Sequence, residues 1–394
     1  MIFDFDVHVC LISEQQAPNL LPALDPELRP KARKMVMLVS DKMKPNADRL
    51  VGVLKRHGFH PNSLTMLDIN PYDYEGICNK LAGHLDRPEN KGKKIALNIT
   101  GGTKIMALAA QAVFFAAGLP MFYVNESTSR VIVMDGKTSP GEGFPLGVKL
   151  HMKDYLSAYG YKPKLPSNLR FTPKFAKELV DSPSRYEKGL IRLNGIVVKA
   201  KSKTRLDFAG ETNDDAEVLK PILALCAEHR LVKSPVLKPG SWSFVSLSAR
   251  KYVCGGWLED YVFDALSGLE DKIQGKERDL EIRTVPKDVE NQLDVVFIAD
   301  NRLHIIECKT GRLEQAAGFT DEHNKATPAL DKLRNLMSRT GLKTKALLVT
   351  WRELDQKNNP LNKNRAEAYG IKVIQKDELR DLKTQLAKWI EARD

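Results

Sequence analysis

The first third of the chain alternates strand-like and helix-like segments. Apolar runs of strand length occupy residues 6–13, 34–40, 63–69, 93–100 and 120–126. Helical spacing of apolar residues occupies 46–58, 74–85 and 103–118. Strands that alternate with helices fold into an open, mostly parallel sheet. The sequence therefore predicts an N-terminal doubly wound α/β domain, with a hairpin strand at 130–136.

This alternation breaks at a Pro- and Gly-rich stretch, residues 140–145. Residues 146–250 contain short helices and strands between polar loops, an order that favours a small winged-helix-like connector. From 251 the pattern changes to an amphipathic helix, three consecutive strands, a polar helical region at about 316–340, two more strands and a terminal helix. We expect three domains, 1–145, 146–250 and 251–394, because 394 residues exceed one ordinary domain.

The net charge of +11 is concentrated in the middle of the chain. Residues 151–254 contain 19 basic and 10 acidic residues, whereas residues 255–394 contain 24 and 25. An excess of this kind fits a segment that faces phosphates, and it also fits a solvated basic surface.

The cysteines and the hydropathy indicate a cytoplasmic protein. Five scattered cysteines, without a CxxC pair, predict neither a disulfide framework nor a thiolate zinc site. No run approaches the roughly 20 uncharged apolar residues of a membrane span, so we expect no membrane partner. The N-terminus lacks the basic region of a signal peptide.

The strand RLHIIECKT, residues 302–310, ends in charged residues. Glu307 and Lys309 share one face of it because side chains alternate along a strand. The preceding strand carries Asp294, and the short turn between the strands predicts an antiparallel hairpin. In that register Asp294 lies opposite residues 307–309. The pattern predicts a cluster of two carboxylates and a lysine; an ion pair on an edge strand is the alternative.

Such a cluster suits a hard divalent cation. Mg²⁺ prefers carboxylate and carbonyl oxygens, which Asp294, Glu307 and the backbone carbonyl of Cys308 offer. The cation polarises a phosphodiester and activates a bound water, and Lys309 assists that water or the developing charge. The Cys308 side chain itself is expected to pack in the core, and His304 on the same face is expected to be structural.

A second candidate site lies in the first domain. In NITGGTKIM a strand ends, two glycines turn and a helix begins, which places backbone N–H groups at a helix N-terminus. The polar loop after the first strand opens at the same edge of the sheet, where doubly wound folds bind ligands. The predicted ligand-binding residues are Ser13, Gln15, Gln16, Asn19, Thr100, Gly101, Gly102, Thr103 and Lys104. Neither a Walker A motif nor GxGxxG is present, and a plain turn with a helix cap is the alternative.

The spacing of Asp294, Glu307 and Lys309 resembles the motif of the PD-(D/E)xK nuclease superfamily. That superfamily often adds an acidic residue from a preceding helix, for which Glu259 is the candidate and Asp260 the second choice. Leu293 replaces the proline of the motif, which weakens the pattern.

The segment TGGTKIM and the polar loop 13–19 resemble the CARF domain, the Rossmann-like sensor of cyclic oligoadenylates in CRISPR systems. With the nuclease motif, the chain resembles CRISPR-associated CARF nucleases activated by cyclic tetra-adenylate. The resemblance implies a homodimer that shares one cyclic ligand and a restriction-endonuclease-like domain that uses Mg²⁺ or Mn²⁺ on DNA, RNA or both.

The hypothesis from the sequence is a nuclease that a cyclic oligoadenylate activates, with Glu259, Asp294, Glu307 and Lys309 as catalytic residues. Two alternatives stay open. One is a non-catalytic, ligand-responsive regulator that binds nucleic acid through the basic middle segment. The other is an unregulated restriction or repair nuclease whose first domain only positions DNA.

Overall fold

The structure is a computed structural model of the chain. It describes residues 5–28, 33–134, 143–164, 171–200, 204–207, 213–233, 241–311, 326–355 and 360–392. The part of the predicted polar helix at 316–325 lies outside these ranges.

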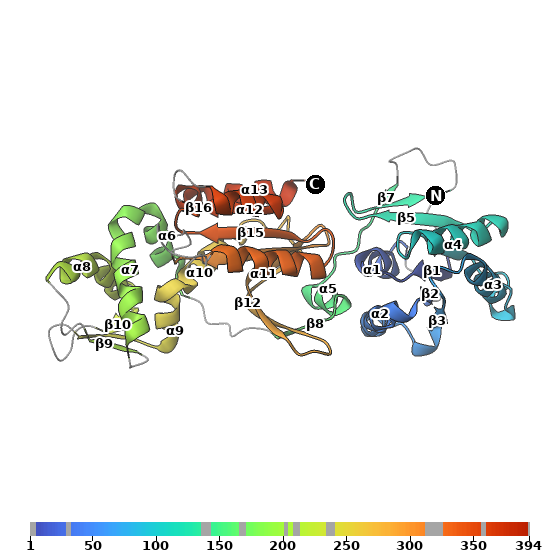
Figure 1. Ribbon diagram of the computed structural model, residues 1–394, viewed down its shortest axis with the longest axis horizontal. Helices are drawn as coiled ribbons and strands as arrows, with labels where there is room; N and C mark the ends of the chain where they lie inside the picture. Colours follow the sequence, from blue (N-terminus) through green and yellow to red (C-terminus); the bar gives the residue numbers. More distant parts are fainter. Residues whose placement is uncertain are drawn as a thin grey trace.

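The N-terminal domain is the predicted doubly wound sheet (Figure 1). Its strands follow the order β3-β2-β1-β4-β5-β6-β7, with the first five parallel and the last two added antiparallel. The strands are β1 (Val7–Leu11), β2 (Lys34–Val39), β3 (Leu64–Asp68), β4 (Ile95–Asn98), β5 (Met121–Asn125), β6 (Arg130–Val133) and β7 (Phe144–Pro145). The helices are α1 (Ala17–Leu24), α2 (Lys44–Arg56), α3 (Tyr74–Leu85) and α4 (Lys104–Ala116).

Both faces of this sheet are covered. In β1, Val7, Val9 and Leu11 pack in the cluster that contains α3 and α4, whereas Cys10 packs in the cluster that contains α1 and α2. Strand β1 is therefore buried along its whole length, which explains why its sequence is almost uniformly apolar.

The C-terminal domain is built on a mixed sheet of order β16-β15-β14-β13-β12-β8. Its strands are β8 (Tyr161–Lys164), β12 (Gly275–Thr284), β13 (Glu290–Ala299), β14 (Arg302–Lys309), β15 (Lys345–Thr350) and β16 (Ile371–Gln375). Helices α10 (Trp257–Leu266) and α13 (Leu382–Glu391) pack on one face. The other face is covered by α11 (Ala326–Arg339), with α12 (Leu361–Ala368) beside it.

The middle segment forms helices and a small antiparallel sheet of order β10-β11-β9. Its elements are α6 (Pro173–Asp181), α7 (Pro183–Lys199), β9 (Arg205–Asp207), α8 (Asn213–Glu228), β10 (Val232–Lys233), β11 (Ser241–Phe244) and α9 (Leu247–Lys251). The order is two helices, β9, a third helix and the pair β10 and β11, and the winged-helix-like fold of this segment stays a prediction. The apolar side chains of this segment join the core on the α10 face of the C-terminal sheet.

The middle segment does not lie between the other two domains. Figure 1 shows it at one end of an elongated molecule, with the C-terminal domain in the centre and the N-terminal domain at the other end. Helix α5 (Met152–Ala158) and β8 make the direct junction, because α5 packs against α2 and β8 pairs with β12. The predicted limits 146–250 do not coincide with this pairing, since residues 161–164 are part of the C-terminal sheet.

One apolar cluster runs across the junction. It includes core residues of the N-terminal domain, Tyr155 and Tyr159 at α5, and residues of β13, β14 and α11. The two domains therefore share an apolar core, to which the tyrosines at α5 belong.

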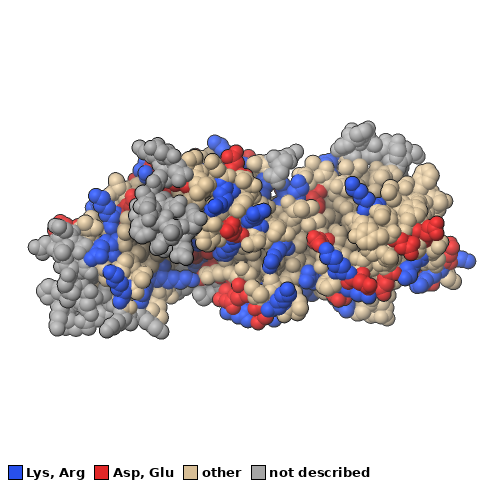
Figure 2. Space-filling view, in the orientation of Figure 1, with Lys and Arg blue, Asp and Glu red and all other residues tan. Residues whose placement is uncertain are grey.

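Charge is mixed on the face that Figure 2 shows. Lysine and arginine side chains are spread along it with acidic side chains among them. In the described part of the chain, no helix combines the length and apolarity needed to cross a membrane.

Candidate nuclease site and sensor cavity

The hairpin of β13 and β14 has the predicted register. Val295 pairs with Ile306, so the next pair toward the open end of the hairpin is Asp294 and Glu307. The Cys308 backbone N–H donates a 2.7 Å hydrogen bond to Asp294 Oδ2. Both carboxylates are buried, Asp294 at 7% and Glu307 at 3% exposure. Rigid paired strands thus hold two acidic groups side by side.

Two lysines neutralise Glu307. Lys309 Nζ lies 2.6 Å from Glu307 Oε1, and Lys332 Nζ from α11 lies 2.6 Å from Glu307 Oε2. Burial alone would lower the pKa of Lys309, but the carboxylates of Glu307 and Asp294 outweigh it and raise that pKa. Burial, followed by the nearby Glu307 charge, raises the pKa of Asp294. The site is therefore a compact cluster of opposite charges, in which the two carboxylates are buried and the two lysines are partly exposed.

The donor atoms suit a hard divalent cation. Lys309 Nζ lies 2.6 Å from Glu307 Oε1, 3.3 Å from the Cys308 carbonyl oxygen and 3.7 Å from Asp294 Oδ2. One positive group thus reaches all three of the oxygens predicted as ligands, so these oxygens converge on a region that favours positive charge. Carboxylate and carbonyl oxygens are the ligands that Mg²⁺ uses in proteins.

Glu259 lies at the rim of this cluster. It follows the π-helical turn Tyr252–Gly256 at the start of α10 and lines a small cavity of about 120 Å³ with Lys251, Arg278 and Asp279. Burial, followed by the charge of Asp294, raises the pKa of Glu259 to about 7. Asp260, the second choice from the sequence, is instead ion-paired with Arg278.

The raised pKa of Glu259 predicts a pH-dependent stability effect. Because the pKa of Glu259 is higher in the folded state than in the unfolded state, the free energy of unfolding decreases as pH rises from the unfolded-state pKa to the folded-state pKa. This cost in stability is complete above about pH 7. The variant Glu259→Gln removes this cost, so we expect its Tm in EDTA to exceed that of the wild type at pH 8. The two Tm values should converge near pH 4.5, where the wild-type carboxyl is protonated in the folded state. Differential scanning fluorimetry across this pH range measures the effect, and an equal difference at both pH values would contradict it.

The sensor cavity lies at the carboxyl ends of β1, β2 and β3. It has a volume of about 700 Å³. Ser13, Gly102 and Thr103 of the predicted ligand-binding set line it. The Thr103 side chain caps α4 by accepting the Met106 backbone N–H. The position of the cavity and the residues that line it agree with the rule that doubly wound sheets bind ligands at this edge.

The other predicted ligand-binding residues support the loops around the cavity. Gln16 Nε2 donates to the Ser13 carbonyl at 2.8 Å, and Asn19 Nδ2 donates to the Leu11 carbonyl at 3.0 Å. Thr100 Oγ1 accepts the Val124 backbone N–H.

The remaining three predicted residues, Gly101, Lys104 and Gln15, have different surroundings. A Cβ on Gly101 would approach the Leu11 carbonyl oxygen to 2.2 Å, so that position requires glycine. Lys104 is exposed in the first turn of α4, and Gln15 faces the nuclease domain. Ligand contact by the nine residues stays a prediction.

Several residues that line the cavity were not anticipated. They come from the end of β3 and from the segments after β2 and β3, and include Ser40, Asp41, Lys42, Asp68, Asn70 and Tyr72. The carboxyl ends of all central strands meet at this edge, so the same topological rule could have identified them.

Lys332 was also missed. It lies on a helix 25 positions after Glu307, with no motif around it.

Other candidate groups have structural roles. Cys308 packs in the core, as predicted. His304 is buried and stacks on Phe297 at 4.7 Å, and burial lowers its pKa to about 3.

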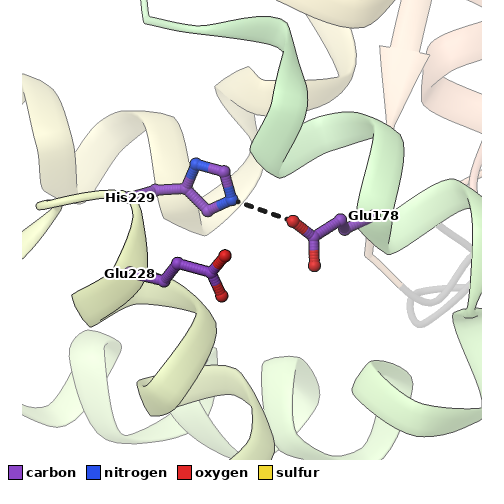
Figure 3. Close-up of side chains that lie close together, drawn as sticks. All are labelled: Glu178, Glu228 and His229. Carbon is purple, nitrogen blue, oxygen red and sulfur yellow. Dashed lines mark hydrogen bonds and ion pairs between the residues drawn. The ribbon is translucent and has the colours of Figure 1, made fainter.

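Figure 3 shows Glu178, Glu228 and His229 close together in the middle segment, where their potential ligand atoms lie within 4.8 Å of one another. His229 Nε2 and Glu178 Oε1 form a 3.1 Å ion pair when the imidazole is protonated, which accounts for their proximity.

Comparison with known families defines the class of protein. A family model for the Card1 CARF domain matches residues 7–155, and one for the Card1-like endonuclease domain matches residues 247–393. The chain is thus a CARF-domain nuclease. Both of its matched domains are of the Card1 kind, and the predicted pairing of a CARF domain with a nuclease domain is confirmed.

Two of the similar solved structures cover nearly the whole chain. VC1899 from Vibrio cholerae is 22% identical, with a TM-score of 0.81 and coverage of 98% of both chains, which supports the fold. Can2 from Sulfobacillus thermosulfidooxidans, solved in complex with cyclic tetra-adenylate, is 26% identical, with a TM-score of 0.76 and coverage of 99% of both chains. No curated protein matches the sequence.

Proposed function

We propose that the chain is a metal-dependent nuclease, activated by a cyclic oligoadenylate, that cleaves or nicks DNA, RNA or both in CRISPR defence. The observation that carries this proposal is that one oxygen each of Asp294, Glu307 and the Cys308 carbonyl lies within 4.0 Å of Lys309 Nζ, in a domain of an endonuclease family. A salt bridge with only a structural role would not require a carbonyl and two buried carboxylates around one point.

Each residue of the site has a chemical role in this proposal. Asp294, Glu307 and the Cys308 carbonyl would hold Mg²⁺ or Mn²⁺, and such an ion supplies Lewis-acid polarisation of the phosphodiester and a water of lowered pKa. Lys309 orients the attacking water or stabilises the charge that develops on the phosphate oxygens. The Cys308 N–H fixes the Asp294 carboxylate, and Glu259 completes the acidic rim.

The activator is proposed to be cyclic tetra-adenylate. Support comes from the CARF family match, the Can2 complex and the cavity of about 700 Å³ beside the N-terminus of α4. Backbone N–H groups and the dipole at a helix N-terminus favour the phosphates of such a ring. Lys104 is positioned in the same first turn to add a positive charge.

A homodimer would place two sensor cavities on one cyclic ligand. Helix α4 carries Leu108 and Phe115 at 60% and 74% exposure, and their spacing of seven puts them on one helix face. Exposed apolar patches of this kind mark interaction surfaces.

We expect the double variant Leu108→Asp, Phe115→Asp to be monomeric in light scattering, whereas the wild type is dimeric. Its affinity for the cyclic ligand should fall, because half of the shared site is lost. The matched control is Val198→Asp, which changes an apolar side chain that is 84% exposed on α7, away from the sensor. A dimeric double variant would argue against this interface.

The function is tested by measuring cleavage of plasmid, single-stranded DNA and RNA with a panel of cyclic oligoadenylates, with Mg²⁺, Mn²⁺ or EDTA. Cleavage that requires both metal and one ring size supports the proposal. Turnover without any ligand would favour an unregulated nuclease. Ligand-dependent nucleic-acid binding without cleavage would favour a non-catalytic regulator.

A further inference from the structure

Lys332 occupies the side of Glu307 that Lys309 leaves open. The two lysines take different oxygens of this carboxylate, each at 2.6 Å. Lys309 comes from the same strand as Glu307, but Lys332 comes from α11, which packs against the sheet as a separate element. A movement of α11 relative to β14 would therefore change one of these two pairs and leave the other in place.

The far end of α11 is attached to the sensor side of the molecule. The Tyr155 hydroxyl, on α5, donates a buried 2.8 Å hydrogen bond to the carbonyl of Thr340, directly after α11. Two residues later, the Leu342 backbone N–H donates a 2.9 Å hydrogen bond to Gln15 Oε1. Gln15 belongs to the loop after β1, whose Ser13 lines the sensor cavity. The hydrogen bond between Leu342 and Gln15 thus joins the loop after β1, which lines the sensor cavity, directly to the nuclease domain.

The junction is tightly packed. Gly341 has φ +120°, and a Cβ there would approach the Tyr155 and Tyr159 hydroxyl oxygens to 2.8 and 2.9 Å. The Tyr159 hydroxyl in turn accepts the backbone N–H groups of Gln16 and Ala17, each at 3.4 Å. Residues 15–17 are therefore connected, directly or through the two tyrosines, to the turn that follows α11.

Helix α11 is suited to transmit a shift of this turn over its length. Leu330, Leu333 and Leu336 are buried and hold it on the sheet as one apolar stripe. From Thr340 back to Lys332 the distance along the axis is about 12 Å at the helical rise of 1.5 Å per residue. A displacement of the helix at one end therefore moves Lys332 at the other.

We propose that Lys332 is a positioning residue of the nuclease site and that α11 connects it to the sensor loop. This inference rests on the proposed function. In the resting enzyme Lys332 holds Glu307 Oε2 and competes with a divalent cation for it. Ligand binding at residues 13–19 displaces the turn at 340–342 through Gln15 and the α5 tyrosines, and α11 withdraws Lys332 from Glu307. The carboxylate is then free to hold the metal beside Asp294.

The test measures Mn²⁺ affinity rather than cleavage. Electron paramagnetic resonance counts free Mn²⁺ over the full-length wild type, Lys332→Met and Lys332→Arg, each with and without cyclic tetra-adenylate. We expect the ligand to tighten Mn²⁺ binding by the wild type. Lys332→Met should bind Mn²⁺ on the order of tenfold more tightly than the wild type without ligand, the scale of outer-shell effects on metal affinity. The ligand should then add little, whereas Lys332→Arg keeps the charge and should respond like the wild type.

A second variant tests the route through α5. Tyr155→Phe removes the hydroxyl that holds Thr340 and leaves the ring packed on Tyr159. We expect it to bind the cyclic ligand as the wild type does, yet to show a smaller ligand-induced gain in Mn²⁺ affinity. An undiminished gain would overturn the route.

For Lys332 itself, unchanged ligand-free affinity in Lys332→Met, or an undiminished response to the ligand, would overturn the inference. These failures differ from a failure of the proposed function. A wild type that neither binds cyclic tetra-adenylate nor cleaves with metal would reject the function itself. Ligand-dependent, Glu307-dependent cleavage by the wild type, combined with wild-type Mn²⁺ behaviour in Lys332→Met, would reject only the role of Lys332.

Discussion

The variant Glu307→Gln should lose nuclease activity while it keeps its fold and its ligand. Glutamine preserves the shape of the side chain but removes the charge that two lysines and the proposed cation share. We expect cleavage to fall by at least about 10²–10³-fold, the range for removing one preorganised electrostatic group from an active site. Asp294→Asn should have a similar effect, because Asp294 faces the same point.

The measurement is nicking of supercoiled plasmid with saturating cyclic tetra-adenylate and added Mn²⁺. The control is Glu281→Gln, which removes a carboxylate on β12 that is paired with Lys164 at the sheet edge. This control should cleave at the wild-type rate. Isothermal titration with the cyclic ligand checks that the sensor of each variant is intact. Retained cleavage by Glu307→Gln in Mn²⁺ would remove Glu307 from the site.

The second large effect is expected in the sensor. Lys104→Ala removes a positive charge from the first turn of α4, beside Thr103 and the cavity. A hydrogen bond to a charged group contributes about 1.5–3 kcal/mol, which corresponds to roughly a 10–150-fold loss of affinity for a phosphate-containing ring. The ligand concentration needed for half-maximal cleavage should rise accordingly, while the cleavage rate at saturation stays at the wild-type value.

Lys93 offers a matched control for this experiment. It is exposed and lies just before β4, whereas Lys104 lies beyond the other end of the same strand. Lys93→Ala changes the net charge equally but lies at the opposite edge of the sheet, so it should leave ligand affinity unchanged. If the two variants behaved alike, Lys104 would have no specific contact with the ligand.

Local patterns were sufficient to predict the nuclease hairpin. The short turn between β13 and β14 leaves one register that buries the apolar residues on both faces, and this register places Asp294 opposite Glu307. The alternating strands and helices of the N-terminal domain also defined its class, because each segment carries its own periodicity. The position of the sensor cavity, at the carboxyl ends of the strands, could be predicted from the doubly wound topology alone.

Features that depend on contacts between distant segments could not be predicted in this way. The sequence around Lys332 is typical of an exposed helix, and only the packing of α11 on the sheet brings it to Glu307. Strand β8 is four residues long, and nothing in YKPK indicates that its partner is β12, more than a hundred residues later. The hydrogen bonds by which Gln16 and Asn19 hold the Ser13 and Leu11 carbonyls could not be predicted either, because the sequence does not show which backbone groups a polar side chain reaches.

Strand β8 also limits how this protein can be divided. The chain enters the nuclease sheet at β8, leaves to form the middle segment, and returns to the same sheet at β12. A fragment that began at residue 251 would lack β8, so the backbone groups of β12 that pair with it would form an open sheet edge prone to association. The nuclease is therefore not a detachable module behind a hinge. Strand β8 completes its sheet and directly follows the sensor in the chain. An exchange of the nuclease domain between relatives would therefore have to carry β8 together with residues 251–394.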